Sequence, residues 1–243
     1  MQALVITGGS RGIGARVAFG AARRGCRMAL AYQKNRARAD AVVAEAARLG
    51  GQAVALPMEL ADEASIVRFF AEIDRTLGPC DGLVNSGGIL GPSGRIEAVP
   101  AAGLAEIMAV NVTGTFLCCR EAIRRMSTKH GGKGGAIVNL GSAASRLGAP
   151  GENVPYAASK GAVDSLTFGL AQEVAAEGIR VNAVSPGVID TEIQPPGRVE
   201  RVGPLLPMKR VGRPEEVAEA ILWLLSDASS YVSGAVLNVS GGR

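Results

Sequence analysis

Short apolar runs alternate with amphipathic stretches along most of the chain. The runs are mostly uninterrupted, as expected of strands buried on both faces of a parallel sheet. They predict strands at Ala3–Ile6, Met28–Tyr32, Ala53–Pro57, Leu83–Asn85, Ala136–Leu140, Val181–Ser185 and Val236–Val239. Helical spacing of apolar residues in the stretches between them predicts helices at Ala37–Leu49, Ala64–Leu77, Leu104–Met126, Tyr156–Glu177 and Glu215–Leu225.

This order of elements predicts an α/β fold. Strand–helix alternation gives a doubly wound parallel sheet with helices on both faces and ligands at the carboxyl ends of its strands. The 243 residues, 47% of them hydrophobic, are enough for one large core, and no linker, repeat or low-complexity tract divides them. We therefore predict a single Rossmann-type domain over residues 1–243 with a seven-stranded parallel sheet.

One irregular span, residues 186–213, follows a predicted strand end. It holds five of the twelve prolines, namely Pro186, Pro195, Pro196, Pro204 and Pro207. Long irregular segments inside a compact domain usually have a function. We interpret this span as a lid over the substrate site, and the alternative is a packed surface excursion.

Charge and aromatic content argue against nucleic-acid and membrane partners. The net charge of +4 is scattered, and only 4% of the residues are aromatic, so no stacking platform accompanies a basic stripe. No apolar run reaches the length of a membrane span, and the first predicted strand begins almost at Met1. We expect a cytoplasmic protein without a signal peptide.

Cysteine and histidine usage argues against metal chemistry. The four cysteines, Cys26, Cys80, Cys118 and Cys119, show no C-x-x-C spacing and are expected to be reduced thiols. The single histidine, His130, lies among Lys129, Gly131 and Gly132 in a predicted surface loop. One solvated histidine supports neither a histidine metal site nor a serine–histidine hydrolase, so we predict no metal.

A glycine cluster separates the first predicted strand from the helix-like stretch that follows it. Gly8, Gly12 and Gly14 give the spacing G-x-x-x-G-x-G, which differs from the common G-x-G-x-x-G fingerprint. A strand that ends at such a cluster and restarts as a helix presents free backbone N–H groups and the helix dipole to a phosphate. The alternative is a glycine-rich turn that binds no ligand.

A second motif opens the helix predicted at residues 156–177. Tyr156 and Lys160 are four residues apart and therefore share a helix face. A cation about 4 Å from a phenol, at an effective dielectric constant near 20, supplies roughly the 3–4 kcal/mol needed to bring a tyrosine pKa near neutrality. Taken alone, the pair is also compatible with a buried tyrosine and an unrelated surface lysine.

Together, the glycine loop, Ser142 at a strand end and the Tyr156/Lys160 pair resemble the short-chain dehydrogenase/reductase family over essentially the whole chain. The resemblance implies hydride transfer between NAD(H) or NADP(H) and a carbonyl or alcohol. It implies that Tyr156 is the general acid/base, that Lys160 lowers its pKa and binds the nicotinamide ribose, and that Ser142 binds the substrate oxygen. Asn111 matches the family's helix asparagine, which holds a water that links Lys160 to solvent, although a structural asparagine bonded to the backbone remains the alternative.

The same resemblance implies a cofactor site along the strand ends. Its residues would be Gly8, Ser10, Arg11, Gly12, Ile13, Gly14, Tyr32, Lys34, Glu59, Leu60, Asn85, Ser86, Gly87, Tyr156, Lys160, Pro186, Gly187, Ile189 and Thr191. Two positions depart from the family pattern: Asn85 opens an Asn-Ser-Gly-Gly turn where Asn-Asn-Ala-Gly is usual, and Glu59 stands where an aspartate often contacts adenine.

Charge near the second predicted strand favours NADP(H) over NAD(H). An NAD-binding fold usually has an acidic residue there, about 20 residues beyond the glycine loop, but no carboxylate occurs before Asp40. Arg11 stands inside the glycine loop, and a 2′-phosphate would be attracted by Arg11 together with Lys34 or Arg36. A solvated loop arginine is the alternative reading of Arg11.

The substrate is defined only by class. The expected pocket lining is mostly apolar and comprises Ile89, Leu90, Ala143, Ala144, Leu147, Val154, Val188 and Ile193. A neutral ketone or aldehyde fits, and a 3-oxoacyl-carrier-protein reductase is the alternative. Against the latter, Glu177 lies where those reductases typically present an arginine, and Lys129 or Lys133 compensates only in part.

The sequence leaves open whether the protein is catalytic or regulatory and whether it is an oligomer. A non-catalytic NADP(H)-sensing regulator on the same fold is a more remote alternative, because a sensor has no need for Asn111, Ser142, Tyr156 and Lys160 together. By resemblance, the apolar faces of the predicted helices Leu104–Met126 and Tyr156–Glu177 would form the interfaces of a homotetramer or homodimer, although core helices of a monomer would look the same.

Overall fold

The computed structural model describes residues 3–243 and contains one seven-stranded, all-parallel sheet. Its order is β3-β2-β1-β4-β5-β6-β7, which confirms the predicted α/β class. The strands are β1 (Ala3–Thr7), β2 (Arg27–Tyr32), β3 (Gln52–Pro57), β4 (Gly82–Asn85), β5 (Gly135–Leu140), β6 (Ile179–Pro186) and β7 (Val236–Val239). Because β1 pairs with both β2 and β4, the strand order reverses at β1, which is where open parallel sheets of this kind bind ligands.

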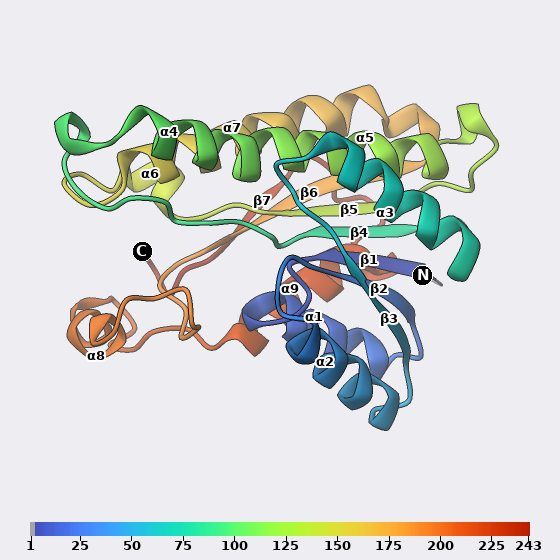
Figure 1. Cartoon of the computed structure of the whole chain (residues 1–243), viewed down its shortest axis with the longest axis horizontal. Coiled ribbons are helices and arrows are strands. Elements are labelled where there is room, and N and C mark those ends of the chain that lie inside the picture. The colour runs from blue at the N-terminus through green and yellow to red at the C-terminus, as the bar shows by residue number, and fades with distance from the viewer. Residues whose placement is uncertain (1–2) are drawn as a thin grey trace.

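Helices cover both faces of the sheet (Figure 1). They are α1 (Gly12–Ala22), α2 (Arg36–Arg48), α3 (Glu63–Thr76), α4 (Ala101–Ile107), α5 (Gly114–Met126), α6 (Ala144–Leu147), α7 (Val154–Glu173), α8 (Arg198–Val202) and α9 (Pro214–Leu225). The predicted long helices are all present, with their ends shifted by a few residues, and Pro214 opens α9 as expected. The four residues of α6 and the five of α8 are too few to show a helical period, so the sequence did not reveal these helices.

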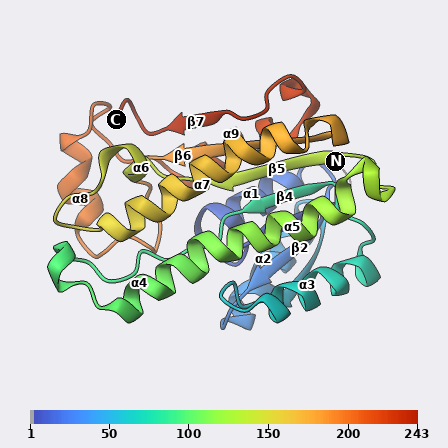
Figure 2. The ribbon, with the colours of Figure 1, turned by 90° about the horizontal axis from the view of Figure 1, so that it is seen from above.

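Alternation along each strand builds two cores. In β1, Leu4 and Ile6 join the core under α1, α2 and α9, whereas Val5 joins the core under α3, α5 and α7. Successive strand side chains point to opposite faces, so β1 to β6 supply both cores, whereas β7 contributes only to the first. The helices that cover the second core are seen from above in Figure 2, where α5 continues the line of α4 and α7 runs beside them across the sheet.

The predicted helix Leu104–Met126 is longer than expected. It starts at Ala101 and runs to Met126 through a π-helical turn at Met108–Thr113. No charged residue occurs between Glu106 and Arg120, so the helix is long and apolar enough to cross a membrane by length and composition. The prediction that no segment reaches this length was therefore wrong. The helix nevertheless packs on β4 and β5, between α3 and α7, as a core helix of the domain.

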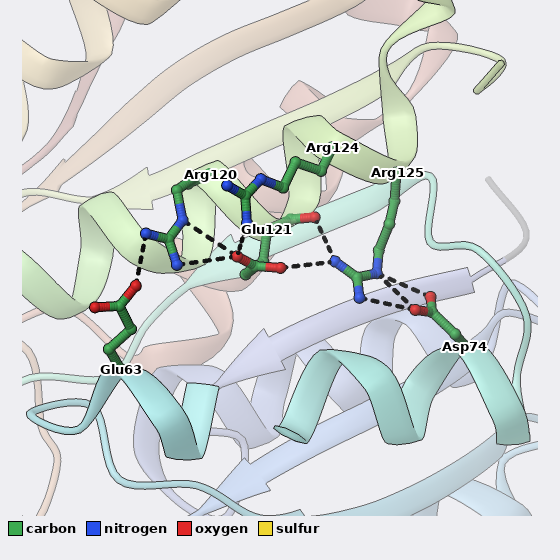
Figure 3. A network of polar contacts seen from close by, with 6 residues as sticks. All are labelled: Glu63, Asp74, Arg120, Glu121, Arg124 and Arg125. Atoms are coloured by element: carbon green, nitrogen blue, oxygen red, sulfur yellow. Dashed lines mark hydrogen bonds and ion pairs between the residues drawn. The ribbon is translucent and has the colours of Figure 1, made fainter. Parts of the chain in front are cut away.

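A network of ion pairs joins α5 to α3 (Figure 3). Glu121 on α5 pairs with Arg120, Arg124 and Arg125, at N–O distances of 2.9 to 3.1 Å. Arg125 continues to Asp74 on α3 at 2.7 Å. The network thus holds the outer helix α3 against the helix that backs β4 and β5.

Candidate functional site

The glycine loop between β1 and α1 is shaped by close backbone contacts. Gly8 and Gly12 have positive φ angles of 62° and 52°, which side chains other than glycine rarely adopt. A Cβ on Gly8 would lie 2.8 Å from the Cα of Gly87 in the loop after β4, and one on Gly14 would lie 2.5 Å from the Gly8 carbonyl oxygen. The glycines therefore let the loops after β1 and β4 meet at the crevice.

The N-terminus of α1 opens on the same crevice. Its N-cap residue, Arg11, makes no side-chain capping hydrogen bond, and its first turn contains no acidic residue. The first backbone N–H groups and the positive end of the helix dipole therefore remain available to an anion. This is the arrangement that binds phosphate groups in dinucleotide sites.

A cavity of about 460 Å³ follows the carboxyl ends of β1, β2, β4 and β5. This volume lies within the usual range for small-molecule sites. Twelve of the predicted cofactor residues line it, namely Gly8, Ser10, Arg11, Gly12, Ile13, Tyr32, Lys34, Glu59, Leu60, Ser86, Gly87 and Thr191. The sequence did not indicate several others, which are Ala31, Gln33, Met58, Ala61, Gly88, Glu106, Val110, Leu140 and Glu192.

Two cations at one end of the cavity have no protein partner. Within residues 3–243, neither Arg11 nor Lys34 makes a hydrogen bond or an ion pair through its side chain, and both are exposed. The neighbouring Arg36 is instead held by Asp40 at 3.0 Å, and Arg38 by Glu192 at 2.7 Å. Arg11 and Lys34 are therefore the cations that remain available to an anionic ligand.

Glu59, also at this end, is partly occupied by the protein. Its carboxylate accepts a hydrogen bond from the Gln33 amide at 2.6 Å and one from the Ala61 backbone N–H at 3.3 Å. Its own N–H donates to the Ser65 hydroxyl at 2.9 Å. These contacts fix the carboxylate in the cavity wall.

Tyr156 and Ser142 meet at the other end of the crevice. Tyr156 lies in the first turns of α7, and Ser142 follows β5. Burial raises the pKa of Tyr156, and a hydrogen bond from the Ser142 hydroxyl lowers it only in part. The structure thus pairs the two hydroxyls that the resemblance assigns to one substrate oxygen, and it keeps the phenol protonated.

Lys160 is buried behind the cavity wall, with 6% of the residue exposed. Its Nζ donates to the Leu140 carbonyl oxygen at 2.7 Å and lies 5.8 Å from the centre of the Tyr156 ring. A Cβ on Gly88 would lie 3.7 Å from this Nζ, so the ammonium stands directly behind the cavity-lining Gly88 and Leu140. Burial lowers the pKa of Lys160 to about 8, although the charge of Asp164 opposes this.

Asn111 sits in the π-helical turn, and its side chain is fully used by the protein. Its amide oxygen accepts from the Ile89 N–H at 2.9 Å, and its amide nitrogen donates to the Ile89 carbonyl at 2.9 Å and to the Ser159 hydroxyl at 3.1 Å. Thr115 donates to the Asn111 backbone carbonyl at 2.8 Å. The side chain therefore connects the loop after β4 to α7. Only the second lone pair of its amide oxygen remains available to a water molecule. Single π turns occur frequently at functional sites.

The structure does not place the Asn85 side chain at the cavity. Its amide nitrogen donates to Asn139 at 2.9 Å and contacts the Cys119 sulfur at 3.3 Å, inside the second core. Asn139 in turn donates to Thr167 on α7 at 3.0 Å. The departure from the family pattern at residues 85–88 therefore changes which groups flank the cavity, while Asn85 itself connects β4 to β5 and α5.

Four more predicted cofactor residues lie beside the cavity without lining it. Gly14 packs on the glycine loop, and Gly187 packs on Ser240, where a Cβ would lie 2.9 Å from its Cα. Ile189 is buried in the first core, and the Pro186 carbonyl accepts from the Ala143 N–H at 2.8 Å. Of the predicted substrate-pocket residues, Ile89 and Ile193 line the cavity, whereas Leu147 and Val154 are exposed.

The side chains that commonly bind metal ions do not cluster in the described residues. Within the part of the chain that the structure describes, residues 3–243, no group of three or more His, Cys, Asp and Glu side chains is placed to hold a metal ion. The single histidine, His130, is exposed in a short helical turn after α5. The chemistry-bearing groups that do meet are thus the Tyr156 phenol, the Ser142 hydroxyl and the Lys160 ammonium.

Comparison with known proteins agrees with this geometry. A family profile described as "Enoyl-(Acyl carrier protein) reductase" matches residues 8–243. The chain is 50% identical to the uncharacterized oxidoreductase YgfF of Escherichia coli (strain K12), over 100% of both chains. It is 34% identical to a 3-oxoacyl-[acyl-carrier-protein] reductase of Synechocystis sp., over 99% of this chain and 96% of that one.

The chain also superposes closely on solved structures. A short-chain dehydrogenase/reductase from Serratia marcescens BCRC 10948 superposes with a TM-score of 0.92 at 32% identity, covering 99% of this chain and 97% of that chain. A blue fluorescent protein from a metagenomic library, solved in complex with NADPH, gives the same TM-score, identity and coverage. At identities of 32% over nearly the whole chain, the likeness extends beyond the fold to the family.

Proposed function

The chain belongs to the short-chain dehydrogenase/reductase family, and on that premise we propose that it is an NADP(H)-dependent oxidoreductase acting on a ketone, an aldehyde or the corresponding alcohol. The observation that carries the proposal is the meeting of Tyr156, Ser142 and Lys160 beside a glycine-lined cavity with two unpartnered cations. Packing alone does not require these groups to occur together. Their combination supports carbonyl and alcohol chemistry rather than mere nucleotide binding.

The residues present fit a dinucleotide. Gly8, Gly12 and Gly87 line the cavity without side chains, and the N-terminus of α1 opens on it. Glu59 would face the adenine, and Lys160 would reach the nicotinamide ribose through the gap beside Gly88. When bound, the nicotinamide supplies or accepts a hydride.

Arg11 and Lys34 would bind the 2′-phosphate that distinguishes NADP(H) from NAD(H). Both are free of protein partners, and no acidic residue occurs at the end of β2 to repel a phosphate. Arg36, the other cation suggested by the sequence, is held by Asp40 and by the Tyr32 hydroxyl. The structure therefore favours Lys34 over Arg36 as the second phosphate ligand.

Titration of the two cofactors tests this assignment. Arg11→Ala should weaken NADPH binding by about tenfold or more, since a hydrogen bond to a charged group contributes roughly 1.5–3 kcal/mol. NADH binding should change less than about twofold, because NADH has no 2′-phosphate. Arg36→Ala is the matched control and should leave both dissociation constants near the wild-type values. Equal losses for NADPH and NADH in Arg11→Ala would contradict the assignment.

The side chains of this chain would manage the proton of the reaction. Ser142 would donate a hydrogen bond to the substrate carbonyl oxygen and hold it beside the Tyr156 hydroxyl, which would deliver the proton. Lys160 would stabilise the phenolate left behind, because burial makes that anion costly and the ammonium is the nearest cation. Reduction of the carbonyl is the direction that NADPH favours in a cell.

A panel of carbonyl compounds tests the proposed activity. NADPH absorbance should fall with at least one member of a panel of diketones, aldehydes and acetoacetyl thioesters. No consumption of NADPH across the panel, with NADPH binding intact, would instead support the NADP(H)-sensing regulator. The panel also narrows the substrate class, which the mostly apolar lining describes only as neutral.

A 3-oxoacyl-carrier-protein reductase remains the second candidate, because a relative of that name is 34% identical over nearly the whole chain. The structure gives little support for a surface on this chain that would bind an acidic carrier protein. Glu177 is buried and accepts from Ser127 at 2.5 Å and from Lys129 at 2.6 Å, so Lys129 is neutralised rather than presented. We expect acetoacetyl-coenzyme A and an acetoacetyl carrier protein to be reduced with similar kcat/KM, whereas a reductase of this class would strongly prefer the carrier.

Residues 186–213 would act as a lid. Thr191, Glu192 and Ile193 line the cavity, and two ion pairs hold the segment across it. Glu192 pairs with Arg38 on α2 at 2.7 Å, and Arg198 on α8 pairs with Glu152 before α7 at 2.7 Å. The segment thus contributes to the cavity wall and is fastened to two other parts of the chain, which supports a cover over the cavity.

The same proposal includes a homotetramer or homodimer in the cytoplasm. Leu104, Met108 and Phe116 on α4 to α5 and Phe168 on α7 are exposed large apolar side chains, which an interface would bury. Burial raises the pKa of the free thiols of Cys80, Cys118 and Cys119, which makes them slow to oxidise. Free thiols are typical of a reducing compartment such as the cytoplasm. Light scattering on the purified protein tests the oligomeric state.

A further inference from the structure

Three chemistry-bearing residues occur at every fourth position of α7. Tyr156, Lys160 and Asp164 therefore form one row on a single helix face. The first two have roles in the proposed reaction, whereas Asp164 has none. A half-buried carboxylate one turn beyond a buried ammonium requires an explanation, because such a group costs free energy unless it is paired.

The Asp164 carboxylate lies against the end of β5. Its Oδ1 is buried and has no hydrogen-bond partner among the described residues. A Cβ on Gly141 would lie 2.9 Å from this oxygen, so the glycine is what lets the carboxylate approach the chain there. Gly141 separates Leu140, whose carbonyl holds Lys160, from Ser142, so Asp164 backs the segment that carries both contacts.

Ser145 connects Asp164 to the Ser142 turn. Its hydroxyl is hydrogen-bonded to the Asp164 carboxylate and lies 2.9 Å from the Ser142 carbonyl oxygen. A hydroxyl has one proton to donate, and two acceptors are within its reach. The Ser142 amide segment, Ser145 and Asp164 are thus coupled through a single proton position.

The charges around Asp164 and Lys160 are few. Burial raises the pKa of Asp164, whereas the Ser145 hydrogen bond and the positive charges of Lys160 and Arg146 lower it. Asp164 is the charged group that opposes the effect of burial on Lys160. Tyr156 on α7 and Arg146 on α6 are the other titratable or charged groups that face this pair in the described chain.

We propose that Asp164 is a positioning residue of the catalytic site: its carboxylate keeps the buried Lys160 ammonium charged and, through Ser145, fixes the turn that carries Ser142. This inference rests on the proposed function, because Lys160 and Ser142 act on a reaction only if the chain is an oxidoreductase. Asp164 touches neither substrate nor cofactor. Its effect reaches the chemistry through two neighbours.

Direct titration of Lys160 tests the electrostatic half of the proposal without any turnover. The chain contains five lysines, so ¹³Cε-lysine NMR gives few resonances, and Lys160→Met assigns the one of interest. The wild-type resonance should titrate near pH 8. In Asp164→Asn the midpoint should fall by about one pH unit, because a neighbouring carboxylate favours the ammonium form. Glu173→Gln, an exposed charge change on the same helix, should leave it unmoved.

Kinetics test the other half. The alkaline limb of the kcat/KM profile should move to lower pH in Asp164→Asn and stay in place in Ser145→Ala and Glu173→Gln. Ser145→Ala should lower kcat about fivefold to tenfold with unchanged NADPH affinity, as expected when one net hydrogen bond to the Ser142 turn is lost.

Each result has a defined meaning. Asp164→Ser removes the same charge with a smaller side chain and must reproduce the shift if Asp164→Asn folds poorly. An unmoved Lys160 titration in both folded variants would overturn the proposal. An inactive wild-type protein whose Lys160 titration still shifts in Asp164→Asn would contradict the proposed function and leave the coupling of Asp164 to Lys160 standing.

Discussion

Two groups of charges lie on the same side of the sheet and are treated in opposite ways. On α5, Glu121 has 5% of its side chain exposed and pairs with Arg120, Arg124 and Arg125 (Figure 3). Arg120 and Arg125 also pair with acidic residues on α3. On α7, Lys160 is equally buried but makes one hydrogen bond to a carbonyl and no ion pair within residues 3–243.

The directions of the pKa shifts express the difference. Burial alone would raise the pKa of Glu121, but hydrogen bonds from Arg125 and Arg120 and the charge of Arg124 outweigh it, so the pKa is lowered and the charged form is favoured. Burial lowers the pKa of Lys160 to about 8, so its surroundings disfavour the charged form relative to a lysine in water. A charge that its surroundings favour stabilises the fold, whereas one that they disfavour is typical of a functional site.

The largest effect that this comparison predicts is on turnover. Lys160→Met should lower kcat by about a thousandfold, because general acid–base assistance contributes roughly 10²–10⁴ and depends here on the neighbouring ammonium. The protein should stay folded, since methionine fills a similar volume without a buried charge. Stopped-flow measurement of NADPH consumption gives the rate. A kcat within tenfold of the wild-type value would contradict a role for Lys160 in the reaction.

Glu121→Gln should have the reverse pattern. The free energy of unfolding should fall by about 2 kcal/mol, less than for a fully buried pair because Arg124 remains 59% exposed, while kcat and cofactor affinity stay unchanged. Urea unfolding at pH 7 measures the first, and the NADPH assay the second. A loss of activity without a loss of stability would show that the network serves the site and not the fold.

The pH dependence of stability separates the two clusters further. Between its folded pKa of about 8 and its unfolded value near 10.5, Lys160 binds fewer protons in the folded chain, so the free energy of unfolding rises with pH in this window. Between pH 8 and about 9.5, the free energy of unfolding of the wild type should rise by about 1.5 kcal/mol relative to that of Lys160→Met. Parallel urea midpoints for the two proteins across this range would mean that Lys160 is not held in a disfavoured charge state.

Glu63→Gln is the smallest change and a matched control for Glu121→Gln. Glu63 pairs with Arg120 at 2.8 Å at the edge of the same network, but its side chain is 60% exposed. An exposed ion pair contributes about 0.5 kcal/mol or less. A loss as large as that of Glu121→Gln in the same urea titration would show that position in the network, and not burial, sets the energy.

The sequence predicted the fold closely because each strand is a short apolar run and each long helix has a clear period. It missed α6 and α8, which are shorter than two helical turns, and the start of the α4–α5 helix at Ala101. It also missed the membrane-length character of that helix, since Asn111, Thr113 and Thr115 interrupt the apolar run without adding charge.

The site was predicted less evenly, for physical reasons. The glycine loop and the Tyr156/Lys160 pair are local patterns, and local spacing places them on one turn or one helix face. The Arg38–Glu192 pair joins residues far apart in the chain, and no local pattern predicts it. Asn85 was expected at the cofactor because its neighbours are, but strand alternation turns its side chain toward Asn139 and Cys119.

Tyr156 is the most direct test of the account, because both the proposed reaction and the role of the buried Lys160 depend on its phenol. The measurement is the single-turnover rate of NADPH oxidation with the best carbonyl of the panel, for wild type and Tyr156→Phe at saturating NADPH. We predict a rate at least about a thousandfold lower in the variant, with NADPH affinity and melting temperature within error of wild type. A rate within tenfold of wild type would contradict the central claim that Tyr156 delivers the proton.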